Sequence, residues 1–377
     1  MEYSIEGAKE LVIRAGEILV QSGLIARTWG NISARISDEK FVITPSGLAY
    51  ETLTPEQIVE VNIADCRYEG NIKPSSEKGI HADTYRLRSD VNFIIHTHQV
   101  MASVISIEGK DIIVHNDEYK KILGEVVPCA AYGMPSTGKL RKKVAEAVQN
   151  YPGSKAVLMK YHGTICMGKD LENSFEIAQV LEKMSKEIYE QVCGKNKKSM
   201  VQIPDYGRSR RTGNTFILEC SGKSSEYTIY GLYDSAPEAA LHAEIYKSCN
   251  TPYIIHTTDE EVVEASSTGR TLKPLLDDLT QIVGVNIKTV KNVLLNPKAA
   301  AKELKNKNAV LLENEGAFCT GKTEVDAEAA AMILRKGCAA DLYAAALNKT
   351  DRLSTVDAYI QRVIYTKKYS KMKEQRG

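Results

Sequence analysis

The stretch Phe93-Ile-Ile-His-Thr-His98 places two histidines two residues apart in an apolar, β-prone run. Side chains at positions i and i+2 leave the same face of a strand, so His96 and His98 can both reach one ion. A third histidine, His162, ends another apolar run, Ala156-Val-Leu-Met-Lys-Tyr-His162-Gly163. Three neutral nitrogen ligands leave one zinc coordination position open for substrate, as in catalytic zinc sites. The three histidines therefore predict a catalytic zinc site.

The chain also contains two copies of one unit. Four segments recur in the same order: 41–47 as 216–222, 77–86 as 238–247, 94–98 as 254–258, and 157–163 as 310–316. Such internal repetition indicates a duplicated structural unit. Short β-branched runs alternate with longer helical patterns in each copy, which predicts a mixed α/β fold. We expect two domains, at 1–193 and 213–377, joined by a polar linker at 194–212.

Composition narrows the class of partner and the location. The 377 residues include 49 basic and 48 acidic side chains, a net charge of +1, which argues against a nucleic acid partner. The eight cysteines form no Cys-x-x-Cys pair, so we expect reduced thiols in a cytoplasmic protein. The N-terminus has the spacing of an amphipathic helix rather than of a signal peptide. The Lys-rich tail from Lys349, with spaced apolar residues, predicts a terminal amphipathic helix rather than a binding segment. No apolar run reaches about 18 residues, so no membrane partner is expected.

Three short clusters rich in small polar residues precede the histidines. They are Thr-Trp-Gly-Asn at 28–31, Thr-Pro-Ser-Gly at 44–47 and Pro-Ser-Ser at 74–76. Backbone N–H groups near glycine, together with Ser and Asn side chains, are typical of phosphate cradles, although each cluster alone is also typical of a turn. Glu77 directly follows the last cluster. Its carboxylate is suited to remove a proton from a carbon beside a carbonyl, or to stabilise a helix N-terminus.

The order of these motifs resembles the class II aldolase/adducin family over residues 1–193, with a pattern similar to that of zinc-dependent L-fuculose-phosphate aldolases. The resemblance implies cleavage of a ketose 1-phosphate to dihydroxyacetone phosphate and an aldehyde. It also implies a three-layer α/β/α fold with a mostly antiparallel sheet, and a homo-oligomeric ring of four units with active sites at subunit contacts. The implied site residues are the phosphate ligands Gly30, Asn31, Ser46, Gly47, Ser75 and Ser76, the zinc ligands His96, His98 and His162, and the general base Glu77.

One position departs from the aldolase pattern. Where those aldolases place a tyrosine acid, nineteen residues after the second histidine, this chain has Asp117. The ribulose-phosphate 4-epimerases of the same family have an aspartate in a similar context, but tend to carry Ser-Ser-Asp in place of Ser-Ser-Glu77. Asp117 is therefore the expected acid, and Tyr119, Tyr132 and Tyr206 are alternatives. Epimerisation, dehydration of a methylthio-sugar phosphate and an adducin-like binding role are the alternative functions.

The second copy keeps only part of this set, because His256 and Glu238 stand at the positions of His96 and Glu77. The equivalents of His98, His162, Ser75, Ser76 and Thr44 are Thr258, Glu315, Ala236, Pro237 and Glu219. A carboxylate repels a phosphate dianion, and proline has no N–H to offer it. We therefore expect an inactive domain retained for assembly, with two chains forming a pseudo-tetramer. A weak metal site at Glu238, His256 and Glu315 is the alternative.

Overall fold

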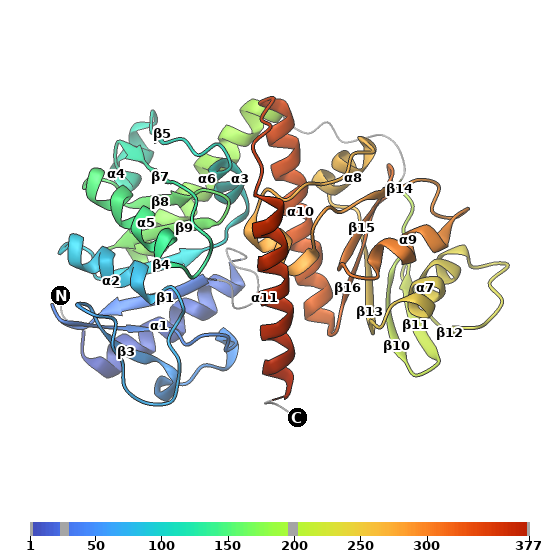
Figure 1. Cartoon of the computed structure of the whole chain (residues 1–377), viewed down its shortest axis with the longest axis horizontal. Helices are drawn as coiled ribbons and strands as arrows, with labels where there is room; N and C mark the ends of the chain where they lie inside the picture. The colour runs from blue at the N-terminus through green and yellow to red at the C-terminus, as the bar shows by residue number, and fades with distance from the viewer. Residues whose placement is uncertain (1–2, 23–29, 195–202, 375–377) are drawn as a thin grey trace. The chain divides into compact units, whose positions relative to one another are not determined.

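The computed structural model describes residues 3–22, 30–194 and 203–374, with side chains up to residue 367. The chain folds into two compact units, residues 1–191 and 192–377, which are considered one at a time. In Figure 1 the first unit runs from blue to green and the second from yellow to red.

The first unit is built on a seven-stranded sheet in the order β3-β2-β1-β4-β9-β8-β7. Its strands are β1 (Gly30–Arg35), β2 (Lys40–Ile43), β3 (Val59–Asn62), β4 (Phe93–Thr97), β7 (Cys129–Ala130), β8 (Ala156–Met159) and β9 (Gly163–Gly168). All neighbouring strands are antiparallel except β7 and β8. A separate antiparallel pair joins β5 (Ile112–Ile113) to β6 (Val126–Val127).

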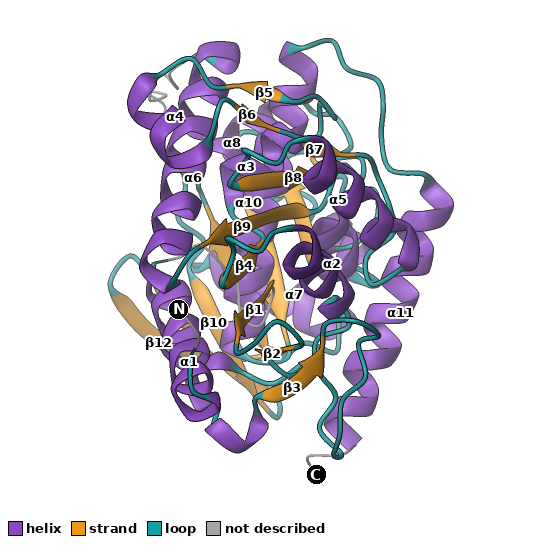
Figure 2. Ribbon diagram, turned by 90° about the vertical axis from the view of Figure 1, so that its left-hand side faces the viewer, coloured by secondary structure: helices purple, strands orange, loops and turns teal. Residues whose placement is uncertain are grey.

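Helices cover both faces of this sheet. They are α1 (Ile5–Gln21), α2 (Lys78–Leu87), α3 (Val100–Ser106), α4 (Asp117–Leu123), α5 (Gly138–Asn150) and α6 (Leu171–Cys193), with 3-10 turns η1 (Tyr50–Thr52) and η2 (Pro55–Gln57). Figure 2 shows α1 and α6 on one side and α2 and α5 on the other. The unit is thus a three-layer α/β/α arrangement with a mostly antiparallel sheet, as expected.

The side chains of β4 alternate between two buried clusters, and this alternation shows which face of the sheet His96 lies on. Phe93 and Ile95 pack in the cluster that includes α1 and α6, whereas Ile94 packs with α2 and α5. Because side chains alternate along a strand, His96 leaves the sheet on the same face as Ile94. In β1, Ile32 lies in the α1 and α6 cluster, so the polar residues on either side of it also face α2.

The second unit repeats this topology, with the sheet order β12-β11-β10-β13-β16-β15-β14. Its strands are β10 (Arg208–Thr212), β11 (Thr215–Cys220), β12 (Lys223–Thr228), β13 (Tyr253–Thr257), β14 (Thr289–Val290), β15 (Ala309–Leu312) and β16 (Gly316–Gly321). Its helices are α7 (Pro237–Ser248), α8 (Glu260–Ser267), α9 (Pro297–Leu304), α10 (Glu324–Ala346) and α11 (Thr355–Glu374), with a π-helical turn η3 (Leu279–Val283). The α/β unit is therefore present twice.

The predicted linker is wrong at its C-terminal end, because Arg208–Thr212 forms strand β10 between β11 and β13. Its register makes Ser209 the equivalent of Ser33, since Ser33 pairs with Ile43 and Ser209 with Leu218. Residues 195–202 of the predicted linker lie outside the described residues.

The predicted terminal helix is present as α11, but its apolar residues do not face the core. Val356, Ile360, Val363 and Ile364 are 42–66% exposed, whereas Ala358 is buried. The N-terminal amphipathic prediction is confirmed by α1, which buries Val12, Ala15 and Leu19. All eight cysteines are free thiols. None of the helices within the described ranges is long and apolar enough to cross a membrane.

Candidate metal and active site

The strand pairing fixes the orientation of His96, which is 2% exposed. Its Nδ1 lies 2.7 Å from the carbonyl oxygen of Thr164 on the neighbouring strand β9. A carbonyl only accepts hydrogen bonds, so Nδ1–H donates and Nε2 carries the lone pair. This arrangement, in which one ring nitrogen is anchored and the other is available, is typical of metal-binding histidines.

His162 is placed by the tight turn between β8 and β9. Tyr161 adopts a left-handed conformation with φ of 66°, and the His162 N–H donates to Met159 over 2.9 Å. A Cβ at the next residue, Gly163, would collide with the carbonyl oxygen of Thr97 on β4. The glycine therefore lets the turn approach β4 closely, which brings His162 to the end of that strand.

The three predicted histidines come together at this point. The rings of His96, His98 and His162 have centroids 4.6–5.1 Å apart, and their candidate ligand nitrogens all lie within 4.8 Å of one another. Nε2 of His98 is 3.2 Å from Nε2 of His96. Across residues 3–22, 30–194 and 203–374, no other group of three His, Cys, Asp or Glu side chains is arranged to hold an ion.

Glu77 lies against the histidines at the start of α2 and is 8% exposed. Its carboxylate oxygens are 3.2 Å from His96 Nε2 and 3.4 Å from His162 Nε2. It also accepts hydrogen bonds from the Asn31 amide over 3.3 Å and from the Ser136 backbone N–H over 3.2 Å. Burial raises the pKa of Glu77, but the charges and hydrogen bonds of His162 and His96 lower it by more, so the net pKa is well below its usual range.

These donors fit a divalent metal ion. The lone pair of His96 Nε2 faces both the Glu77 carboxylate and the nitrogen of His98, each at 3.2 Å. Where that lone pair faces the carboxylate, a proton or a cation between the two groups would satisfy both. Three imidazoles with a nearby carboxylate are a ligand set that zinc favours.

The predicted phosphate clusters lie around Glu77. Ser75 Oγ accepts the Glu77 N–H over 3.2 Å, and Ser76 Oγ is 2.8 Å from Ser136 Oγ. The 44–47 and 74–76 clusters are joined by a bridge between Pro45 and Pro74. The cluster at 28–31 begins outside the described residues, which resume at Gly30. The remaining predicted ligands, Ser46 and Gly47, belong to the bridged segment; the Ser46 N–H donates to Lys73.

The acid candidates are less well placed. Asp117 is the first residue of α4, its side chain is 91% exposed and its ion-pair partner is Lys120 at 3.6 Å. Tyr119 donates to Glu187 of α6 over 2.7 Å. Tyr132 lies in the loop that also holds Ser136, and its ring packs on Tyr161, the neighbour of His162. Of these three side chains, Tyr132 is the one connected to the histidine site by contacts.

Two further features were not predicted from the sequence. The backbone N–H of Ser136 comes from a loop about sixty residues away, and no residue type marks a backbone donor. A buried network joins Asn31 to His81, Ser33 and Tyr85, with His81 Nδ1 2.6 Å from Ser33 Oγ and Tyr85 2.7 Å from the same oxygen. Its signal was the recurrence of His81 and Tyr85 at His242 and Tyr246 in the second copy.

In the second unit, Tyr206 occupies the equivalent place. By strand register it corresponds to Gly30, and it is 4% exposed. Its ring packs 4.8 Å from that of His256, and its hydroxyl donates to Glu315 over 3.0 Å. This burial and pairing contradict the prediction of Tyr206 as an alternative acid.

The alternative metal site of the second unit is also wrong. His256 Nδ1 accepts the Tyr206 backbone N–H over 3.1 Å, and its Nε2 is 2.7 Å from the Glu315 carbonyl oxygen. Both ring nitrogens are thus engaged by the main chain. Glu238 is partly exposed and belongs to no group of side chains suited to an ion within the described residues.

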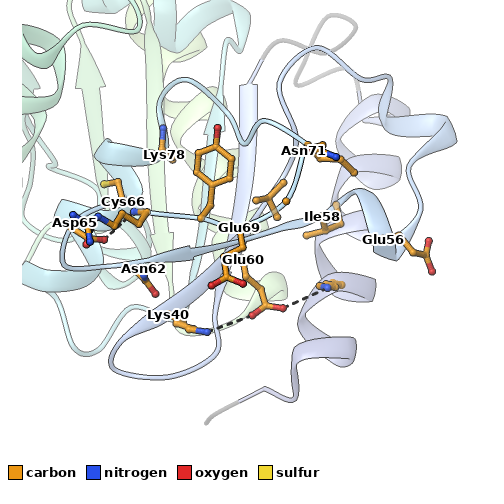
Figure 3. Close-up of a pocket in the computed structure, with 16 residues that line it drawn as sticks. Lys40, Glu56, Ile58, Glu60, Asn62, Asp65, Cys66, Glu69, Asn71 and Lys78 are labelled. Carbon is orange, nitrogen blue, oxygen red and sulfur yellow. Dashed lines mark hydrogen bonds and ion pairs between the residues drawn. The ribbon is translucent and has the colours of Figure 1, made fainter.

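A cavity of the first unit lies elsewhere, along the edge strand β3 (Figure 3). It measures about 930 Å³ and touches none of the predicted site residues. Its charges pair with one another, since Lys9 and Lys40 both approach Glu60, and Arg67 approaches Asp65.

Comparison with known proteins identifies the family of the chain. The class II aldolase and adducin N-terminal domain family matches residues 10–189 and 217–342. The chain therefore belongs to that family, with one match in each unit. L-fuculose phosphate aldolase of Escherichia coli K12 is 34% identical over 164 residues, covering 44% of this chain and 74% of that enzyme.

Two further relatives complete the comparison. The 5-deoxy-D-ribulose 1-phosphate aldolase of Bacillus thuringiensis serovar kurstaki is 32% identical over 179 residues, covering 47% of this chain and 82% of that enzyme. A solved structure of an L-fuculose 1-phosphate aldolase is 28% identical, with a TM-score of 0.46, covering 52% of this chain and 90% of the other.

Proposed function

We propose that the first unit is a zinc-dependent aldolase that cleaves a ketose 1-phosphate of the L-fuculose 1-phosphate type. The products would be dihydroxyacetone phosphate and an aldehyde. The observation that carries the proposal is the convergence of His96, His98 and His162 on the buried carboxylate of Glu77. That combination offers a cation site and a base at one point, which is what enolate chemistry requires.

His96, His98 and His162 would hold the zinc ion, and the ion would supply positive charge for the enediolate form of dihydroxyacetone phosphate. Glu77 would move the proton at carbon. In the condensation direction its carboxylate would take a proton from the carbon beside the carbonyl. In the cleavage direction Glu77 would first gain a proton from solvent and then give it to that carbon. The lowered pKa of Glu77 keeps it ionised, as the condensation direction needs.

The phosphate would be held by the small polar residues that surround Glu77. Ser75, Ser76 and Gly47 supply hydroxyl and N–H donors, together with the hydroxyl of Ser46. The Asn31 amide is directed at Glu77, so its contribution to the phosphate is indirect. Binding the phosphate here would place the carbonyl end of the substrate beside the histidines.

Tyr132 would exchange the proton at the oxygen of the aldehyde fragment. It would accept this proton from the substrate hydroxyl in cleavage and donate it to the aldehyde oxygen in condensation. Its loop contacts Glu77 through Ser136, and its ring packs beside His162 through Tyr161. Asp117 remains the alternative from the sequence, and it would have to act from an exposed position.

The relatives support two substrates of one chemical class. One relative acts on L-fuculose phosphate and another on 5-deoxy-D-ribulose 1-phosphate, and each matches a little less than half of this chain, at 34% and 32% identity. The distal part of the sugar distinguishes these two substrates. Cleavage of the bond between the third and fourth carbons yields dihydroxyacetone phosphate from either.

Incubation with each ketose 1-phosphate and with L-ribulose 5-phosphate tests the proposal. We expect dihydroxyacetone phosphate from a ketose 1-phosphate, and loss of its formation after prolonged chelation. An epimeric pentose phosphate without triose phosphate would establish the epimerase alternative instead. No conversion of any of the three by metal-loaded protein would remove the proposed function.

A further inference from the structure

We propose that His81 is a positioning residue that orients the Asn31 amide, and through it the Glu77 carboxylate. The inference rests on the proposed function, because it concerns the same base. Its observations are the hydrogen bonds that connect Glu77 to the buried end of α2.

The direction of each hydrogen bond follows from the carboxylate. The NH₂ group of Asn31 lies 3.3 Å from a carboxylate oxygen of Glu77 and donates to it. The amide oxygen of Asn31 then faces His81 Nε2. That oxygen also only accepts, so Nε2 of His81 must carry the proton.

The remaining protons are then determined. Burial lowers the pKa of His81 to about 3, so the ring is neutral and holds a single proton. With that proton on Nε2, Nδ1 is an acceptor, and Ser33 Oγ–H donates to it over 2.6 Å. Ser33 Oγ in turn accepts from the Tyr85 hydroxyl over 2.7 Å. The hydrogen bonds therefore all point the same way, from the Tyr85 hydroxyl through Ser33 and His81 to Asn31 and Glu77.

The second unit separates the structural part of this network from the part that serves the site. Ser209, His242 and Tyr246 repeat the same two hydrogen bonds, of 2.6 and 2.7 Å. His242 Nε2, however, donates over 2.8 Å to the main-chain carbonyl oxygen of Tyr206. Gly207 stands where the first unit has Asn31. The Ser-His-Tyr hydrogen bonds that both units share therefore support the fold. The link from the histidine through Asn31 to a carboxylate belongs to the first unit.

Two substitutions distinguish the two ends of the His81 ring. The amide of glutamine reaches to about the position of Nε2, and that of asparagine to about the position of Nδ1. His81→Gln therefore keeps a donor for Asn31, whereas His81→Asn removes it while keeping a partner for Ser33. Both remove the ring from the core, so loss of packing affects them alike. His242→Gln and His242→Asn are the matched controls in the second unit.

Steady-state kinetics of ketose 1-phosphate cleavage and thermal unfolding would be measured for all four variants. We expect His81→Asn to lower kcat about 10- to 100-fold, as misplacement of a catalytic group does, while His81→Gln retains most of kcat. The His242 variants should lower Tm without changing kcat. If KM rises in His81→Asn at constant kcat, Asn31 serves the phosphate and the inference is wrong. Equal kcat in the two His81 variants would also overturn it.

A second measurement is independent of activity and of these variants folding. Nitrogen NMR of labelled histidine reports which ring nitrogen carries the proton. We expect His81 and His242 both to be protonated on Nε2, and Asn31→Leu to change the Nε2–H signal of His81 but not of His242. Protonation of His81 on Nδ1 would refute the inference. If no substrate were cleaved but the NMR result held, the proposed function would fail while the hydrogen-bond chain remained.

Discussion

The two units share one scaffold and differ at the place where chemistry would occur. Both have the same strand order, the same Ser-His-Tyr network and a left-handed residue followed two positions later by glycine in the β8–β9 or β15–β16 turn. In the first unit that turn brings His162 to a cluster of three histidines and a carboxylate. In the second it brings Glu315 to the hydroxyl of a buried tyrosine.

The difference shows that the fold does not depend on the site. Replacement of Gly30 by Tyr206 fills the space with a ring, and the main chain satisfies both nitrogens of His256. The polar groups left by loss of the site are therefore paired, as buried groups need to be. A unit altered in this way remains suited to the assembly role predicted for it, which a measurement of oligomeric mass would test.

The largest expected effect comes from removing the base. Glu77→Gln keeps the shape of the side chain and removes its basicity, so kcat should fall by about 10²–10⁴. Glu238→Gln, at the equivalent position of the second unit, should leave kcat unchanged. A comparable loss in the two variants would break the comparison, because it would make the second unit catalytic.

The acid on the aldehyde side should give a smaller loss. We expect Tyr132→Phe to lower kcat by about 10²-fold, at the lower end for a general acid. Asp117→Asn should change it by less than about threefold, since an exposed side chain is screened by water. Steady-state kinetics of the two variants would show which of the two side chains is the acid. The reverse ranking would show that the exposed aspartate acts at the site in the assembled protein.

Acid should destabilise both units, because each buries a neutral histidine. Burial lowers the pKa of His81 to about 3 and of His242 to about 4, from an ordinary value of 6.5. The unfolded chain therefore binds more protons below pH 6.5. Above pH 6.5 the two histidines do not reduce the free energy of unfolding. Between pH 6.5 and pH 4 each of them lowers it by about 1.4 kcal/mol per pH unit. Unfolding curves of wild type and His242→Gln should show a shallower pH dependence for the variant.

The smallest effect concerns the tyrosine of the second unit. Tyr206→Phe removes the hydroxyl that donates to Glu315, which should cost about 1–3 kcal/mol and lower Tm. Activity should be unchanged. Loss of activity at wild-type Tm would indicate that Tyr206 serves catalysis after all.

The sequence was sufficient where chemistry-bearing residues lie on regular elements. His96 and His98 follow from strand alternation, and the duplicated motifs predicted the repeated α/β unit. Strand β10 was missed because Arg208–Thr212 contains no apolar residue, and Ser209 is the buried position in it. The apolar residues of α11 predicted a buried face, yet that face is exposed.

The interior of the site was harder to predict because its groups are placed by tertiary packing. The Ser136 N–H is a backbone group, placed by a loop distant in sequence. Tyr206 was predicted as an alternative acid, but its ring is buried beside His256 and its hydroxyl donates to Glu315. Local pattern does not encode such tertiary placements.

Metal content per chain tests the central claim most directly, because it separates the two units without a substrate. Elemental analysis of zinc-loaded protein should give one ion per chain. His96→Ala should lose that ion, and His256→Ala should retain it. Two tightly bound ions per chain, or an undiminished content in His96→Ala, would contradict the account.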